Sequence, residues 1–339
     1  MTEIVVWDNL LTAYFKACRG KWNNEEAFFY GRNLDVNLRL LQSQLQAGTP
    51  DVGHYHYFRI YDPKERLICA TSFRERVLHH AIMNVCHKYF DRTLIYDTYA
   101  TRIEKGTYAA LYRVWQGAKR YKYAVKLDVR KYFDSVSHEI LRRILSRLFK
   151  DATLLRIFDA LIDSYNTTDG YGIPIGNLTS QYFANLYLSP VDHFAKNVMR
   201  VPMYVRYMDD IVVLGNNKNE LQSFVVRLEE YIQALKLKLK PKLYIRTEQG
   251  IPFLGYRVYP FKMLLKGTSK CRFKRKITAL ETAMYDGTIT EEDYYCHVVP
   301  LIEYTKKAYT KQLRIRLCIE GRTACCVAAV GTTTRQTVA

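Results

Sequence analysis

The sequence lacks the features of a secreted, disulfide-stabilised or membrane-spanning protein. Its eight cysteines form no C-x-x-C pair and no zinc-binding spacing, so we expect reduced thiols. The first residues show no charged segment followed by an apolar stretch, so we expect no signal peptide. No run of about 18 apolar residues is present, which argues against a membrane-spanning helix. These absences predict a cytoplasmic protein.

Acidic side chains are also scarce. The 339 residues include 51 Lys and Arg against 33 Asp and Glu, which gives a formal net charge of +18. Such an excess indicates a polyanionic partner, most simply a nucleic acid. The 28 tyrosines suit stacking on bases and sugars, although many of them could equally fill a core. The length predicts two or three lobes with ample core.

The stretch 205–215 carries the clearest signal in the chain. Two apolar, β-branched runs flank Asp209 and Asp210, a pattern typical of a tight β-hairpin. Adjacent carboxylates repel each other, but a divalent cation would reverse that penalty, and Mg²⁺ prefers hard oxygen ligands. The alternative is an ordinary surface turn, in which Asp is common.

The N-terminal third is expected to be mainly helical. We expect a helix at 8–18 with Asp8 as its N-cap, and a longer one at 25–47 that Gly48 ends. A strand at 55–61 is expected next, followed by a turn at 62–68 that leads into a second strand. The other expected helices are at 77–90, after the capping residue Ser137, at 178–199 with a division at Pro190, at 220–235, at 273–285 and at 291–318. The other expected strands are at 123–129 and near 242–247 and 253–258.

A third carboxylate completes a recognisable set. Asp128 lies near the end of the strand at 123–129, and the strand and helix order that follows suits a split βαβ sheet. Joining a nucleotide to a 3′-hydroxyl creates negative charge on the attacking and leaving oxygens. Two metal ions held by carboxylates from neighbouring strands can stabilise both oxygens. Asp128, Asp209 and Asp210 therefore predict a nucleotidyl-transfer site.

The chain from about 55 to 260 resembles the fingers and palm of reverse transcriptases. The matching motifs are Y-x-D-D at 207–210, D-x-x-x-x-F/Y at 128–133, the finger segment 63–68, the loop and helix around Gly176, Ser180 and Gln181, and the primer-grip-like segment 253–256. The resemblance implies an α+β right-hand polymerase fold with fingers, an antiparallel split βαβ palm and a small helical thumb. The implied division is 1–54 N-terminal helices, 55–122 fingers, 123–260 palm with finger elements near 150–180, 261–320 thumb and 321–339 a disordered tail.

The same resemblance assigns roles to individual residues. Asp128, Asp209 and Asp210 would hold two Mg²⁺ ions, with Mn²⁺ as an alternative and the Val129 carbonyl as a further ligand. Residues implied to contact the incoming nucleotide are Lys64 and Arg66 at the triphosphate, Phe133 at the sugar, and Ile175, Gly176 and Gln181. The ring of Phe133 would leave no room for a 2′-hydroxyl, which favours deoxynucleotides. Residues expected at the template–primer are Phe253, Gly255, Lys262, Lys266, Lys270, Arg272, Lys274 and Arg275.

The run 173–187 further resembles the reverse transcriptases of diversity-generating retroelements, which occur in bacteria and their phages. Most other reverse transcriptases have Gln where this chain has Ile175. The family copies a template-repeat RNA into cDNA with errors opposite adenine, together with a small basic pentameric accessory protein. A bacterial cytoplasm would then be the location, and no RNase H, integrase or endonuclease segment is expected.

Other interpretations stay open. One is a retron or abortive-infection reverse transcriptase, or a stand-alone enzyme of the group II intron type, although Ile175 argues against the intron type. Another belongs to a different class, a degenerate palm that only binds RNA. The three aspartates argue against that class.

Overall fold

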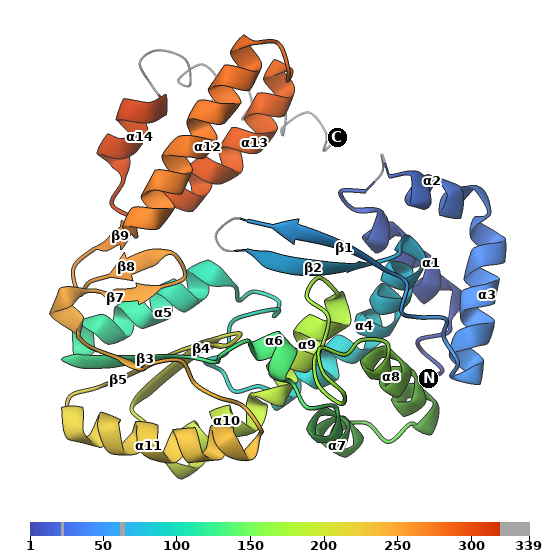
Figure 1. Cartoon of the computed structure of the whole chain (residues 1–339), viewed down its shortest axis with the longest axis horizontal. Helices are drawn as coiled ribbons and strands as arrows, with labels where there is room; N and C mark the ends of the chain where they lie inside the picture. Colours follow the sequence, from blue (N-terminus) through green and yellow to red (C-terminus); the bar gives the residue numbers. More distant parts are fainter. Residues whose placement is uncertain (22–23, 62–64, 319–339) are drawn as a thin grey trace, which may run out of the picture. The chain divides into compact units, whose positions relative to one another are not determined.

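The computed structural model describes residues 1–21, 24–61 and 65–318, and Figure 1 labels its helices and strands. The chain divides into two compact units. The first comprises Met1–Gly106, Leu127–Ile211 and Asn219–Lys242, and the second comprises Thr107–Lys126, Val212–Lys218 and the chain from Leu243 onward. The expected boundaries of fingers, palm, thumb and tail stay predictions.

Three helices begin the first unit: α1 (Trp7–Cys18), α2 (Glu25–Arg32) and α3 (Leu34–Ala47). Two expectations are wrong here. Val6, not Asp8, is the N-cap of α1, and the single helix expected at 25–47 is broken at Asn33, whose ψ of 40° is not helical. Asn readily adopts such conformations between helices because its side chain competes for backbone groups. Gly48 ends α3 as expected, with a left-handed φ of 73°.

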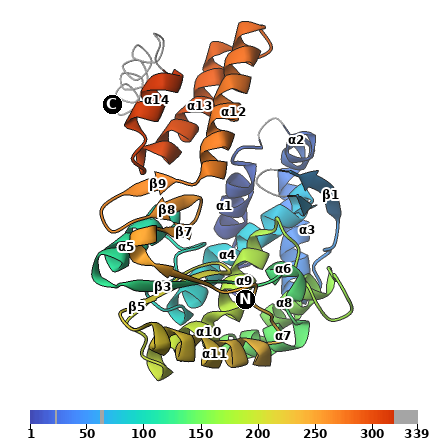
Figure 2. The ribbon, with the colours of Figure 1, turned by 60° about the vertical axis from the view of Figure 1, so that its left-hand side comes forward.

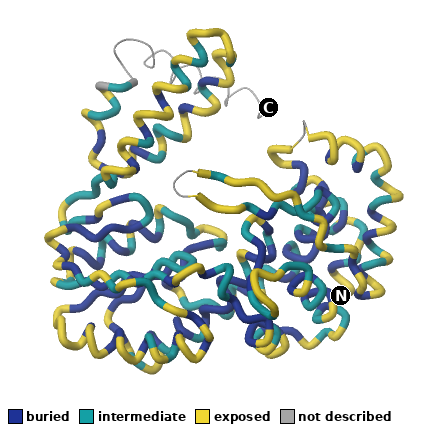
Figure 3. The backbone as a smooth tube through the Cα atoms, viewed as in Figure 1, coloured by how far each residue is buried: buried dark blue, intermediate teal, exposed yellow. Residues whose placement is uncertain are grey.

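An antiparallel hairpin follows, formed by β1 (Tyr55–Ile60) and β2 (Arg66–Thr71) with Tyr55 opposite Thr71. Much of its surface is exposed, whereas the helix after it, α4 (Phe73–Thr93), is largely buried (Figure 3). The N-cap of α4 is Ser72, whose hydroxyl accepts a hydrogen bond from the Glu75 amide. Residues 62–64 of the turn expected at 62–68, including Lys64, lie outside the described residues, and residues 66–68 belong to β2 rather than to a turn.

A four-stranded sheet in the order β4-β5-β3-β6 carries the aspartates. Its strands are β3 (Tyr123–Asp128), β4 (Met203–Tyr207), β5 (Asp210–Gly215) and β6 (Leu243–Arg246), and α11 (Lys218–Ala234) connects β5 to β6. The expected β-α-β-β-α-β order is confirmed. Residues Ile211 to Leu214 are fully buried, as in a strand covered on both faces.

The helices between β3 and β4 are α6 (Tyr132–Ser135), α7 (His138–Leu148), α8 (Ala152–Asp163), α9 (Leu178–Tyr187) and α10 (Ser189–His193), followed by a π-helical turn at Phe194–Val198. Ser137 holds the N-cap position of α7, as expected, but its side chain makes no capping hydrogen bond. Pro190 lies in the first turn of α10 and divides the segment expected at 178–199. Helix α8 has no counterpart among the expected elements, and neither has α5 (Thr107–Arg120), whose buried stripe consists largely of Ala and Gly and gives a weak apolar pattern.

The second unit contains a three-stranded sheet and a helical bundle. The strand expected at 253–258 is instead two, β7 (Ile251–Phe253) and β8 (Tyr256–Val258), since Leu254 and Gly255 have positive φ and form a turn. After the short 3₁₀-helix Thr247–Gln249 and these strands come β9 (Met263–Leu265), α12 (Gly267–Tyr285), α13 (Glu291–Lys306) and α14 (Lys311–Cys318). Helices α12 and α13 lie side by side in both views (Figures 1 and 2) around Phe273, Ile277, Tyr294 and Val298.

Among the described helices, none combines the length and apolar character needed to cross a membrane. The tail expected to be disordered after Glu320 lies outside the described residues.

A buried histidine connects α4 to α9. His79 is 2% exposed, and its Nδ1 lies 2.9 Å from the Thr179 hydroxyl oxygen. Burial lowers the pKa of His79 to about 3, and the nearby His80 and Arg76 act in the same direction. Near pH 6.5, therefore, the His79 imidazole becomes protonated in the unfolded chain but stays neutral in the folded chain.

His79 should make the protein less stable in mild acid. Its folded pKa lies below its unfolded pKa, so its contribution is fully present above about pH 6.5 and declines as the pH falls toward 3. Between pH 7 and pH 5 His79 should account for a loss of about 2 kcal/mol in the free energy of unfolding. His80, whose pKa burial also lowers, to about 4, adds to the total loss. Urea denaturation at both pH values measures the total. His79→Gln should reduce the loss by about 2 kcal/mol, whereas the control His87→Gln should keep all of it; equal losses in both variants would contradict the assignment.

Candidate active site

The two adjacent aspartates lie where β4 turns into β5. Met208 and Asp209 form the turn, and Asp210 is the first residue of β5. Met208 has a φ of 56°, a left-handed conformation that costs a non-glycine residue about 1–3 kcal/mol. Such a turn persists only where the surrounding structure holds it in place.

A fully buried ion pair holds the turn. The Arg206 guanidinium donates to both carboxylate oxygens of Asp192, at 2.7 and 2.6 Å, and both side chains are 0% exposed. Nη1 of Arg206 also donates to the Met208 carbonyl at 3.0 Å and to the Asn185 side chain at 3.1 Å. Burial alone would lower the pKa of Arg206, but the Asp192 carboxylate outweighs burial and raises it. Arg206 therefore stays charged and ties the turn at Met208 and Asp209 to α9 and α10.

The segment after α4 supports the same turn from another side. The Arg206 amide donates to the Asp97 carbonyl at 2.9 Å, and the Tyr99 amide donates to the Arg206 carbonyl at 3.0 Å. These two hydrogen bonds place residues 97–99 alongside β4.

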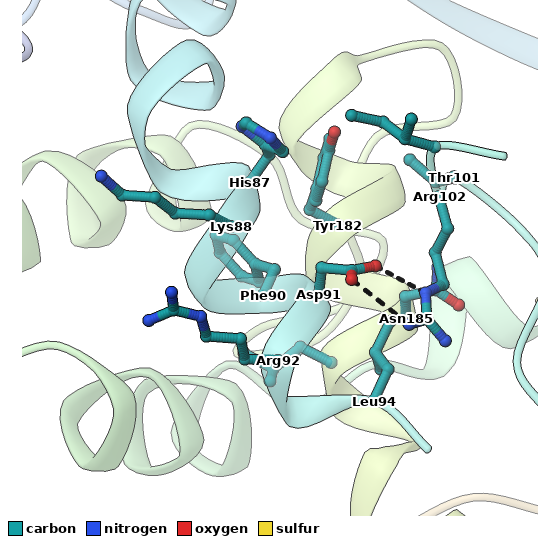
Figure 4. Close-up of a pocket in the computed structure, with 12 residues that line it drawn as sticks. His87, Lys88, Phe90, Asp91, Arg92, Leu94, Thr101, Arg102, Tyr182 and Asn185 are labelled. Carbon is teal, nitrogen blue, oxygen red and sulfur yellow. Dashed lines mark hydrogen bonds and ion pairs between the residues drawn. The ribbon is translucent and has the colours of Figure 1, made fainter. Parts of the chain in front are cut away.

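An ion pair between Asp91 and Arg102 fixes that segment. It lies beside a cavity of about 230 Å³ between α4 and α9, and Asn185 also lines this cavity (Figure 4). The amide of Asn185 donates to the Ala100 carbonyl at 2.5 Å. Asn185 thus contacts both the segment after α4 and Arg206.

Asp128 ends β3 beside residues 238–240, which are not among the residues expected at the site. Residues 238–240 run antiparallel to 128–130, with the Lys240 amide donating to the Asp128 carbonyl at 2.8 Å and the Arg130 amide donating to the Lys238 carbonyl at 2.7 Å. This register places the Lys240 ammonium 2.6 Å from a carboxylate oxygen of Asp128. Val129, whose carbonyl is the expected further ligand, is fully buried within this pairing.

The electrostatics show that two of the carboxylates act on each other. Burial, and then the negative charge of Asp128, raise the pKa of Asp209. The cations Lys240 and Arg66 act in the opposite direction. Arg66 opens β2, so the hairpin β1–β2 brings a guanidinium into the field of Asp209.

The carboxylates are hard oxygen donors of the kind that Mg²⁺ prefers, and a cation between them would offset the effect of the Asp128 charge on Asp209. Asp128, Asp209 and Asp210 would supply the carboxylates. In the part of the chain that the structure describes, no three or more His, Cys, Asp or Glu side chains gather into a metal-binding group. One oxygen of Asp128 instead contacts Lys240.

The loop before α9 contacts the hairpin through its backbone. The Cys69 amide donates to the Ile175 carbonyl at 2.8 Å, while the side chain of Ile175 is only partly buried. Gly176 has a φ of 130°, and a Cβ there would lie 3.0 Å from the Cys69 carbonyl oxygen. Only glycine fits this position, because a side chain would meet backbone that cannot move aside.

Two other residues expected at the nucleotide lie near this loop. The Phe133 carbonyl accepts a hydrogen bond from the Ile173 amide at 2.9 Å, and the ring of Phe133 is partly exposed. Gln181 is exposed on α9 and accepts a hydrogen bond from the Thr101 hydroxyl at 3.3 Å.

The residues expected at the template–primer all belong to the second unit. Lys270, Lys274 and Arg275 are exposed on α12, while Lys262, Lys266 and Arg272 are partly buried. Phe253 is 0% exposed, so any contribution to primer binding would come from its backbone. A Cβ on Gly255 would overlap the hydroxyl of Tyr304, which shows how closely this turn packs against α13.

Residues 62–258 match the family described as reverse transcriptase (RNA-dependent DNA polymerase). The chain belongs to the reverse transcriptase family. This reverse transcriptase is 24% identical over 179 residues to protein YkfC of Escherichia coli, a match that covers 48% of the chain and 46% of YkfC. It is 20% identical over 293 residues to the putative COX1/OXI3 intron 2 protein of Saccharomyces cerevisiae, covering 64% of the chain and 34% of that protein. The chain thus spans less than half the length of these relatives.

The structure is similar to that of telomerase from Candida tropicalis, solved with a fragment of telomeric RNA. The TM-score is 0.51 at 10% identity, and the match covers 75% of this chain and 53% of the telomerase chain. The expected right-hand polymerase fold, with its mixture of helices and strands, is thereby confirmed.

Asp192→Asn should destabilise the reverse transcriptase by about 3–5 kcal/mol, because it leaves the buried Arg206 charge without its carboxylate. The free energy of unfolding in urea measures the change. Asp35→Asn breaks the exposed pair with Arg39 and serves as the control, with no measurable change expected. The double variant Asp192→Leu/Arg206→Met should recover part of the loss. A loss below about 1 kcal/mol for Asp192→Asn would show that the pair does not hold the fold.

Proposed function

We propose that the chain is an RNA-directed DNA polymerase whose active site is formed by Asp128, Asp209 and Asp210. The observation that supports this most directly is the effect of the Asp128 charge on Asp209, which the cations Lys240 and Arg66 oppose. Such an arrangement suits the binding of Mg²⁺ together with a triphosphate. It lies within the part of the chain that matches the reverse transcriptase family.

The residues around the aspartates divide the remaining tasks. When bound, two Mg²⁺ or Mn²⁺ ions would supply charge stabilisation at the attacking and leaving oxygens. Arg66, with Lys64, would bind the triphosphate, for which a planar guanidinium is well suited. The partly exposed ring of Phe133 would lie against the sugar and exclude a 2′-hydroxyl, so the substrate would be a dNTP.

Asp209→Asn should abolish dNTP incorporation on an RNA template, because the amide keeps the shape of the side chain and loses the charge that holds the metal. Primer extension measures incorporation, and filter binding should show RNA affinity within about twofold of the wild type. The exposed Asp35→Asn is the matched control and should extend normally. Extension by Asp209→Asn at the wild-type rate would refute the assignment.

We further propose that the enzyme belongs to a diversity-generating retroelement and makes error-prone cDNA from a template-repeat RNA in a bacterial cytoplasm. A small basic pentameric accessory protein would be its partner. The support is Ile175, whose apolar side chain is partly exposed on the loop that contacts the fingers hairpin. A retron or abortive-infection reverse transcriptase, an intron-type enzyme and an inactive RNA-binding palm are the alternatives.

Ile175→Gln should lower misincorporation opposite template adenine by up to about tenfold, because a glutamine can add one hydrogen bond of about 0.5–1.5 kcal/mol beside the nucleotide. Sequencing of cDNA made on an adenine-containing RNA, with the accessory protein present, measures the error spectrum. Ile175→Val keeps the apolar surface and should leave the spectrum unchanged. An unaltered spectrum in Ile175→Gln, with extension intact, would exclude this side chain as a fidelity determinant.

A further inference from the structure

The position of Lys240 is fixed by the backbone rather than by its flexible side chain. Residues 238–240 pair with 128–130 through two backbone hydrogen bonds and an antiparallel bridge between Val129 and Leu239. Lys240 lies several residues after the end of α11. Its pairing partner is distant in sequence, because Asp128 lies 112 residues away. A lysine held in this way has a defined location, unlike a solvated surface lysine.

The ammonium of Lys240 serves both interacting carboxylates. It contacts Asp128 directly at 2.6 Å and also offsets the repulsion at Asp209. This is the task that a divalent cation would perform at the same residues. The ammonium and a metal ion therefore compete for the same carboxylate oxygen, and two cations so close together would also repel each other.

We propose that Lys240 is the built-in counter-ion of the metal-free active site, which a divalent cation must displace from Asp128 before nucleotidyl transfer. The inference rests on the proposed function only in taking Asp128 as a metal ligand. The lysine stabilises the carboxylates while the site lacks metal, and it lowers the affinity of the site for metal. Because the pair is partly solvated, its strength is modest and the exchange is reversible.

Two binding measurements on the full chain without nucleic acid test this exchange. Mn²⁺ affinity is measured by electron paramagnetic resonance of the free ion, and the melting temperature is measured with and without Mn²⁺. Lys240→Gln should bind Mn²⁺ about 3–10-fold more tightly than the wild type, since it removes both the competition and the repulsion. The same variant should melt at a lower temperature without metal and gain more from added Mn²⁺.

Lys242→Gln is the matched control. It removes the same charge two residues away, but Lys242 pairs with Glu229 rather than with an active-site aspartate. It should keep the wild-type Mn²⁺ affinity. Lys240→Arg retains a cation at Asp128 and should stay closer to the wild type than Lys240→Gln does.

The outcomes separate this inference from the proposed function. Suppose that Asp128→Asn weakens Mn²⁺ binding, so that the metal site stands. The counter-ion role is then overturned if Lys240→Gln leaves the Mn²⁺ affinity and the melting temperature unchanged, or if it weakens Mn²⁺ binding. If the wild type and Asp128→Asn bind Mn²⁺ equally, Asp128 is not a metal ligand and both proposals fail. Tighter binding in Lys240→Gln but not in Lys242→Gln supports the exchange.

Discussion

The structure depends on placing like charges next to each other in a partly buried site. Burial and then the negative charge of Asp128 raise the pKa of Asp209. The fold meets this cost with cations from two distant segments: Lys240 lies against Asp128, and Arg66 lies within the field of Asp209. The carboxylates would attract a divalent cation in place of Lys240, and the basic side chains would attract a polyphosphate, which are the ligands of the proposed reaction.

Fixed geometry is the second requirement, and buried polar contacts supply it. A guanidinium that is 0% exposed would be very costly by itself, but Arg206 contacts the Asp192 carboxylate, the Asn185 side-chain amide and the Met208 carbonyl in the turn between β4 and β5. The loop at Ile175 and Gly176 uses backbone contacts with Cys69 for a similar purpose. In each case, hydrogen bonds or close backbone contacts tie a segment that carries candidate site residues to a neighbouring element.

Local sequence patterns were sufficient to predict much of the architecture. Alternation between apolar runs and carboxylates located the hairpin at Asp209 and Asp210, and turn residues marked the end of α3 at Gly48 and the division at Pro190. The order of strands and helices around the four-stranded sheet followed from the spacing of apolar residues along the chain. These features depend on backbone preferences and on the spacing of neighbouring side chains. Both can be read from a short stretch of sequence.

Only the tertiary structure decided which polar groups meet. Nothing local in the sequence pairs Lys240 with Asp128 across 112 residues, or selects Asp192 as the partner of Arg206. The break at Asn33 was likewise hidden, because the apolar stripe of the flanking helices continues through it. The packing of whole elements determines which two residues form such an ion pair. The strength of the pair depends on burial, and the charge pattern along the chain does not reveal burial. The sequence by itself thus predicted the candidate carboxylates and indicated the reverse transcriptase family, because both depend on short motifs. The fold determined which cations and hydrogen bonds surround those carboxylates, because these depend on the packing of distant elements.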